Sequence, residues 1–231
     1  MLGLGNSITA NQYPVGSWAP TNLGSKLIHW YKFNTGITTA TVGGTDGLIT
    51  QWADQKGSNN LAPEVTNDGT KMPIVHTDNS VRFSGTDDVL VFGSALTLGK
   101  FAIYGRFRTD GFNDRFLQQS DGSEFIKFQS TTQFRIKPDP RFDIVISSDA
   151  NLANDTKFTA GFERNASGDI FVSANSLAST TSANAAISNT IDLQEVSPAN
   201  GGEFDVFEFI ICNDGLSTDE RTQLNAYLDA I

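Results

Sequence analysis

The sequence is poor in the residues that build disulfides and metal centres. It contains one cysteine, Cys212, and two histidines among 231 residues. A single cysteine excludes an internal disulfide and a cysteine-based metal cluster. Cys212 lies in an apolar run, where an unpaired cysteine is typically a small buried side chain. His29 and His76 have no cysteine or carboxylate at ligand spacing, so neither a zinc site nor a catalytic triad is predicted.

Long apolar runs and positive charge are also scarce. No run approaches the ~18 apolar residues of a membrane span, and residues 1–7 lack the basic segment of a signal peptide. Lysine and arginine total 16 against 26 acidic residues, a net charge of -10. We therefore expect no membrane and no nucleic acid as partner, since a nucleic acid requires a basic surface. No glycine-rich phosphate loop precedes a helix, so no cofactor is predicted.

Phenylalanine and glycine are plentiful. The 17 Phe favour strands and supply the bulk of a core, and the 21 Gly favour turns. Apolar and polar residues alternate in short segments separated by turn residues, which is typical of an antiparallel sandwich. The segments that show this pattern most clearly are 27–33, 48–54, 101–108, 134–137, 142–146 and 158–162.

The last 29 residues contain the strongest strand and the clearest helix signal. The strand 203–212 is apolar on both faces, so we expect it in the middle of a sheet that is covered on both sides. Regular alternation places Phe207 with Phe209 on one face. Ser217 and Glu220 have the spacing of a capping box, which predicts a helix over about 217–231. Its apolar stripe, which needs a surface to cover, consists of Leu224, Tyr227, Leu228 and Ile231.

A series of short motifs runs through the chain. They are Trp18-Ala19-Pro20, Trp30-Tyr31, Gln51-Trp52-Ala53-Asp54, Val81-Arg82-Phe83-Ser84-Gly85-Thr86-Asp87-Asp88 and Glu208-Phe209-Ile210-Ile211-Cys212. Their order resembles the concanavalin A-like (LamG-like) lectin/glucanase sandwich, in the form found in structural proteins of tailed bacteriophages. The resemblance covers roughly residues 17–231. It implies an all-β jelly-roll sandwich of two antiparallel sheets with one short C-terminal helix. We expect an extended arm over residues 1–25 and the sandwich over 26–231.

The resemblance implies a non-enzymatic structural protein of a virion, made in the host cytoplasm. Capsid decoration or a head or neck appendage would suit it, with other virion proteins or a second copy of the chain as partners. Eight of the 16 basic residues lie between positions 100 and 141. If the strands that carry them are neighbours, they form a basic face for an acidic partner; the alternative is a solvated face with interspersed acids. The predicted contact residues are Leu2, Leu4, Ile8, Tyr13 and Trp18 of the arm, with Arg106, Arg108, Arg135 and Lys137 of the basic face.

A second hypothesis is a glycan-binding module of a tail fibre, with a host polysaccharide as ligand. It requires exposed aromatic side chains clustered at one end of the sandwich. Tyr13, Trp18 and Trp52 are the early candidates.

A third hypothesis is a retaining glycoside hydrolase. Glu203, Asp205 and Glu208 form an E-x-D-x-x-E pattern that resembles the catalytic strand of laminarinase-type enzymes, where they would be nucleophile, helper and acid/base. Retention requires two carboxylates roughly 5 Å apart. In a regular strand Glu208 faces away from the other two, so a β-bulge would be needed. Only the closing helix follows this strand, so no cleft-forming strands come after it and we favour a non-enzymatic function.

Asp87 and Asp88 are the one weak metal candidate. Their carboxylates could contribute to a calcium site, as in some LamG-like domains. The alternative is that they cap a turn between two strands. Calcium takes six or more oxygen ligands and only two carboxylates are adjacent here, so the turn is the favoured interpretation.

Overall fold

The computed structural model describes residues 18–84, 87–139, 142–148, 150–178, 190–198 and 202–231. The predicted contact residues Leu2, Leu4, Ile8 and Tyr13 therefore lie outside the described residues. The strands are β1 (Leu27–Lys32), β2 (Ile37–Val42), β3 (Thr45–Trp52), β4 (Leu61–Pro63), β5 (Ile74–His76), β6 (Ser80–Ser84), β7 (Leu90–Leu98), β8 (Phe101–Thr109), β9 (Arg115–Gln118), β10 (Phe125–Ser130), β11 (Gln133–Asp139), β12 (Phe142–Ser147), β13 (Phe158–Arg164), β14 (Ile170–Ala174), β15 (Leu177–Ala178), β16 (Ile191–Val196) and β17 (Glu203–Cys212). The helices are the 3-10 helices η1 (Pro20–Lys26) and η2 (Gly69–Lys71) and the α-helix α1 (Thr218–Asp229).

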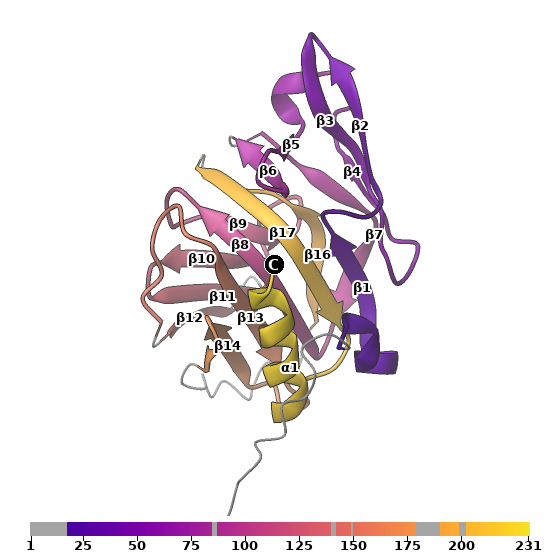
Figure 1. Cartoon of the computed structure of the whole chain (residues 1–231). Helices are drawn as coiled ribbons and strands as arrows, with labels where there is room; N and C mark the ends of the chain where they lie inside the picture. Colours follow the sequence, from indigo (N-terminus) through magenta and orange to yellow (C-terminus); the bar gives the residue numbers. More distant parts are fainter. Residues whose placement is uncertain (1–17, 85–86, 140–141, 149, 179–189, 199–201) are drawn as a thin grey trace, which may run out of the picture.

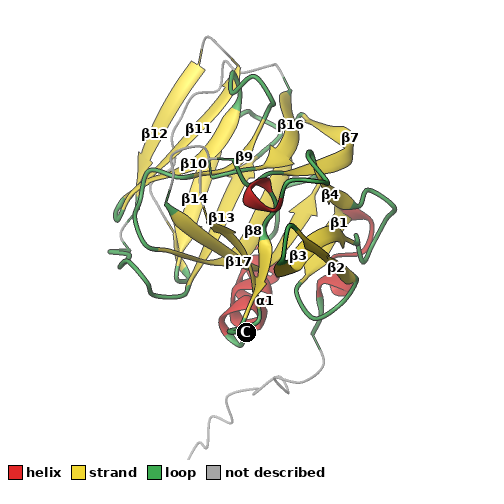
Figure 2. Cartoon of the chain, turned by 90° about the horizontal axis from the view of Figure 1, so that it is seen from above, coloured by secondary structure: helices red, strands yellow, loops and turns green. Residues whose placement is uncertain are grey.

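The strands form two packed layers, as the view from above shows (Figure 2). One layer runs β12-β11-β10-β9-β16-β7-β4, and the other runs β15-β14-β13-β8-β17, with β6 and β1 both beside β17. Strand β3 pairs with β4 and also with β5, so the two layers are parts of one antiparallel network that folds over on itself. The predicted all-β antiparallel sandwich with a C-terminal helix is confirmed.

Phenylalanine rings fill the space between the layers. Phe128 of β10 lies 5.6 Å from Phe204 of β17, and Phe134 of β11 lies 5.5 Å from Phe162 of β13, measured between ring centroids. All four side chains are fully buried. Aromatic pairs at these separations are stabilising beyond the area they bury. The core therefore depends on aromatic contacts between the two layers.

Helix α1 covers the outer face of the layer that contains β8 and β17 (Figure 1). The predicted capping box is present: Ser217 accepts a hydrogen bond from the main-chain N–H of Glu220, whose carboxylate accepts one from Ser217. Leu224 and Leu228 are fully buried against the sheet. The prediction is wrong for Ile231, which lies beyond the end of the helix and is 37% exposed.

Strand β17 is central, as predicted, with β8 on one side and β6 and β1 on the other. The predicted division of its faces is wrong. The register with β8 shifts between Val206 and Glu208, so Phe207 and Glu208 both point outward while Phe209 points into the core. A β-bulge of this kind inserts one extra residue into a strand and reverses the alternation beyond it.

The predicted N-terminal arm is described only from Trp18 onward. Residues 20–26 form η1. Its Leu23 is buried in the same apolar cluster as residues of the sheet and of α1. Lys26 donates a hydrogen bond of 2.7 Å to Glu220 of α1. This short segment is therefore attached to the same outer face as α1.

Candidate ligand-binding site

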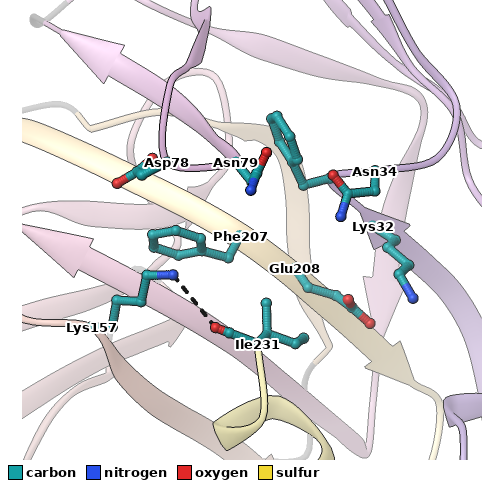
Figure 3. Close-up of a pocket in the computed structure, with 9 residues that line it drawn as sticks. Lys32, Asn34, Asp78, Asn79, Lys157, Phe207, Glu208 and Ile231 are labelled. Atoms are coloured by element: carbon teal, nitrogen blue, oxygen red, sulfur yellow. Dashed lines mark hydrogen bonds between the residues drawn. The ribbon is translucent and has the colours of Figure 1, made fainter.

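A pocket of about 300 Å³ opens on the outer face of the helix-bearing layer. Figure 3 shows that its walls come from segments far apart in the sequence. The lining residues are Lys32, Phe33, Asn34, Asp78, Asn79, Lys157, Phe207, Glu208 and Ile231. A second hollow of about 420 Å³ lies beside it and shares Phe33 and Asn34.

Turns and the β-bulge place the polar groups of this pocket. Asn34 follows β1, and Asn79 lies in the turn between β5 and β6 with a left-handed φ of 67°. Asparagine tolerates this conformation better than most residues. The bulge brings Phe207 and Glu208 to the same face, where regular alternation would have placed only one of them.

The two asparagines have free side-chain amides. Both residues are exposed, and within the described part of the chain neither carboxamide has a hydrogen-bond partner. Each amide offers two N–H donors and a carbonyl acceptor. The aromatic ring of Phe207 also lines the pocket; the residue is 1% exposed, and Lys157 Nζ lies over the ring at 4.0 Å from its centroid. The pocket therefore combines a largely buried aromatic ring with amide donors and acceptors that are free to bind hydroxyl groups.

Glu208 supplies a fixed carboxylate. It is 1% exposed, and its Oε1 accepts hydrogen bonds from Trp30 Nε1 at 2.6 Å and from Tyr227 Oη at 2.7 Å. Burial raises the pKa of Glu208, and the two donors and Lys32 offset part of that rise. The carboxylate is oriented by β1 and α1 together.

This environment predicts a pH-dependent contribution of Glu208 to stability. Because its pKa is raised, the contribution is complete below the ordinary glutamate pKa of about 4.3 and is lost as pH rises through the raised pKa. The Glu208→Gln variant keeps an acceptor oxygen but cannot ionise. We expect its free energy of unfolding, relative to the wild type, to increase from pH 4 to pH 8 by about 1.4 kcal/mol per unit of pKa shift. Urea unfolding at each pH measures this, and parallel curves for the two proteins would contradict it.

Half-buried aromatic side chains lie next to the pocket. Trp18 and Tyr227 have ring centroids 5.8 Å apart, and Lys32 Nζ lies 5.6 Å from the Trp30 ring and 5.9 Å from the Tyr227 ring. Of the predicted aromatic candidates, Trp18 joins this cluster. Trp52 does not, because it is fully buried and packs edge-on against Phe209 in the core. Sequence reasoning missed Trp30 and Tyr227, whose proximity depends on how α1 docks.

Glu203, Asp205 and Glu208 of the E-x-D-x-x-E pattern all lie on the outer face of the sheet. The β-bulge after Val206 reverses the alternation of side chains along β17 and so brings Glu208 to that face. Their environments nevertheless differ. Glu203 has a half-exposed side chain and pairs with Arg82 at 2.9 Å. Asp205 is 2% exposed and accepts hydrogen bonds from Arg82 Nε at 2.9 Å and Arg108 Nε at 2.8 Å. Asp205 is held by two guanidinium groups, whereas Glu208 faces the pocket.

The predicted basic face is not assembled as expected. β8 pairs with β13 and β17, whereas β11 pairs with β10 and β12, so the two arginine-bearing strands are not neighbours. Arg106 pairs with Asp229 at 3.0 Å, Arg108 with Asp78 at 2.6 Å, and Arg135 with Asp143. The order of the strands in the sheets, which depends on contacts between distant segments, separates Arg106 and Arg108 on β8 from Arg135 and Lys137 on β11. Their role in binding a partner stays a prediction, as does that of Lys137.

Asp87 and Asp88, the weak calcium candidates, lie between β6 and β7. Asp88 is buried, and its carboxylate accepts a hydrogen bond of 2.6 Å from the main-chain N–H of Ser84. Asp87 is exposed. Among the residues that the structure describes, no group of three or more His, Cys, Asp or Glu could hold a metal ion, and no helix is long and apolar enough to span a membrane.

Comparison with solved structures identifies the fold as that of known binding domains. The chain is similar to the binding domain of botulinum neurotoxin DC in complex with rat synaptotagmin II, with a TM-score of 0.58 and 14% identity over 88% of this chain and 52% of that one. It is also similar to the ligand-binding domain of botulinum neurotoxin serotype D in complex with N-acetylneuraminic acid, with a TM-score of 0.60 and 9% identity over 92% and 53%.

A further similar structure belongs to botulinum neurotoxin type C, whose cell entry depends upon interaction with two ganglioside molecules. It has a TM-score of 0.58 and 12% identity over 92% of this chain and 53% of that one. The chain thus spans about half the length of these neighbours and has a lectin-like β-sandwich fold. No protein-family model matches the sequence, and no curated protein sequence matches it.

Proposed function

We propose that this chain is a non-catalytic receptor-binding domain that recognises a saccharide in the pocket of Figure 3. The observation that carries the proposal is the convergence of the free amides of Asn34 and Asn79, the Phe207 ring and the Glu208 carboxylate on one hollow. Saccharide hydroxyls need paired donors and acceptors, and the ring carbons need an apolar wall. The fold similarity to domains solved with N-acetylneuraminic acid and with a protein receptor supports the same class of function.

A glycan array followed by titration calorimetry tests this proposal. We expect the wild type to bind one group of glycans, and the double variant Asn34→Ala, Asn79→Ala to bind them about tenfold more weakly or worse. Each lost hydrogen bond costs about 0.5–1.5 kcal/mol, which makes this loss measurable. Asn151→Ala, at an exposed asparagine between β12 and β13, is the matched control and should bind as the wild type does. Equal affinity of the double variant would exclude this pocket, and no binding by the wild type would contradict the function.

The finer assignment from the sequence stays a prediction. We propose that the sandwich is of the concanavalin A-like form found in phage structural proteins, and that the receptor-binding domain belongs to a virion. This proposal rests on the sequence motifs. Mixing the purified chain with phage particles that lack it, followed by cryo-electron microscopy, tests it directly: ordered density on the particles supports a virion role, and bare particles contradict it.

A further inference from the structure

The outer face of the other layer carries a row of three cations. Lys127 on β10 lies directly opposite Arg115 on β9 and directly opposite Arg135 on β11. Neighbouring strands are about 4.8 Å apart, so the row spans about 10 Å. Helix α1 packs on the opposite layer of the sandwich, so it does not cover this row (Figure 2).

One aromatic ring holds both arginines in place. The guanidinium carbon of Arg115 lies 4.6 Å from the Phe125 ring centroid, and that of Arg135 lies 5.4 Å from it. Phe125 is 4% exposed, because the two arginine side chains cover it. A cation–π contact of this kind restrains a guanidinium group, and Arg135 is held further by Asp143, which accepts hydrogen bonds from its Nε and Nη2. The arginines are therefore positioned before any ligand arrives.

The acids near the row neutralise only part of its charge. Arg135 pairs with Asp143, whereas Arg115 donates a hydrogen bond of 2.7 Å to the neutral amide oxygen of Gln118. Glu195 accepts a hydrogen bond from the Gln118 amide and also interacts electrostatically with Arg115.

Lys127 in the middle is 7% exposed, and across the described ranges its ammonium has neither a hydrogen bond nor an ion pair. Burial lowers the pKa of Lys127, and the neighbouring charges of Arg135 and Arg115 lower it further, while the carboxylates of Asp114 and Asp143 offset part of that fall. The Lys127 ammonium reaches solvent at the end of a largely buried stem. Three neighbouring cations repel one another, so an anion bound between them would be stabilised by all three.

We propose that Arg115, Lys127 and Arg135 form a second binding site, which takes a sulfate or phosphate group of a ligand. Guanidinium groups bind such oxyanions through two parallel hydrogen bonds, and an ammonium adds a point charge between them. The site lies on the opposite layer from the pocket of Figure 3, and it stands whether or not the pocket binds a saccharide.

Inorganic phosphate and sulfate are the probes, with chloride at equal ionic strength as the reference. In the wild type, the ¹³Cε resonance of Lys127 should shift saturably with either oxyanion, and the pKa of Lys127 should rise toward the ordinary lysine value. Lys100, which pairs with Asp214 on the surface, is the internal control and should not respond. Saturation by only one of the two probes identifies which group the site takes. No saturable shift with either would overturn the proposal.

A variant removes the central charge. Lys127→Met should bind the preferred oxyanion about tenfold more weakly or worse, as expected when one member of a charged contact is truncated. Lys100→Met should bind it as the wild type does. In chloride alone Lys127→Met should unfold at the same or a higher temperature than the wild type, because a charge that Arg115 and Arg135 repel is removed. Unchanged oxyanion affinity in Lys127→Met, or a marked loss of its stability in chloride, would contradict the proposed site.

Discussion

Replacing Asp205 by alanine is expected to lower the free energy of unfolding by about 3–5 kcal/mol. The carboxylate is 2% exposed and accepts hydrogen bonds from both Arg82 and Arg108. Without it, two largely buried guanidinium groups face each other with only Glu203 and Asp78 nearby. Urea unfolding followed by circular dichroism measures the change.

An exposed ion pair provides the control for this variant. Asp214 pairs with Lys100 at 2.7 Å, and both side chains are more than one-third exposed. Asp214→Ala should change the free energy of unfolding by less than about 1 kcal/mol, as is usual for surface pairs. If Asp205→Ala had an effect as small as that of Asp214→Ala, the carboxylate would not be structural, and the acidic pattern of β17 would need a different explanation.

Replacing Phe128 by alanine should also cost about 3–5 kcal/mol. The ring is fully buried and contacts aromatic rings from both layers, including Phe107 at 5.1 Å and Phe204 at 5.6 Å. Removing it leaves a cavity in the middle of the sandwich that rigid neighbouring rings cannot fill.

The matched comparison is Val145→Ala on β12, whose side chain is 50% exposed. It should change stability by no more than about 0.5 kcal/mol. Thermal and urea unfolding of both variants measure the difference. Similar values for Phe128→Ala and Val145→Ala would show that the inter-layer rings are not the main source of stability.

Local sequence signals predicted the C-terminal region well. Ser217 and Glu220 form the capping box at the start of α1, because a cap depends only on residues three apart. The two apolar faces of strand 203–212 correctly predicted that β17 lies inside a sheet with both faces covered. These features are set by near neighbours in the chain.

The alternation within β17 was not predictable in the same way. Val206, Phe207 and Glu208 are consecutive, and nothing in their order marks Phe207 as the extra residue of a bulge. The bulge becomes visible only against the partner strand β8. Because of this bulge, Phe207 and Glu208 both line the pocket. The candidate site therefore could not be derived from the sequence.

Strand order accounts for the remaining differences. The concentration of basic residues between positions 100 and 141 indicated a charged surface, but the row that forms joins Arg135 to Arg115 and Lys127 rather than to Arg106. Cross-strand register determines which side chains meet. Trp52 similarly belongs with Trp18 to the aromatic residues predicted from the sequence as glycan-binding candidates, but its inward orientation depends on packing against Phe209 of β17.

The central place of β17 has a consequence for synthesis of the chain. β17 comes after every other strand, yet it pairs with β1, β6 and β8. Until it leaves the ribosome, the edge of each of these strands that β17 will occupy has no partner, and the apolar face that α1 covers is open to solvent. Exposed edges of this kind favour aggregation, and contacts between distant segments form slowly. The nascent chain therefore passes through an interval in which almost the whole sandwich has been translated but cannot close.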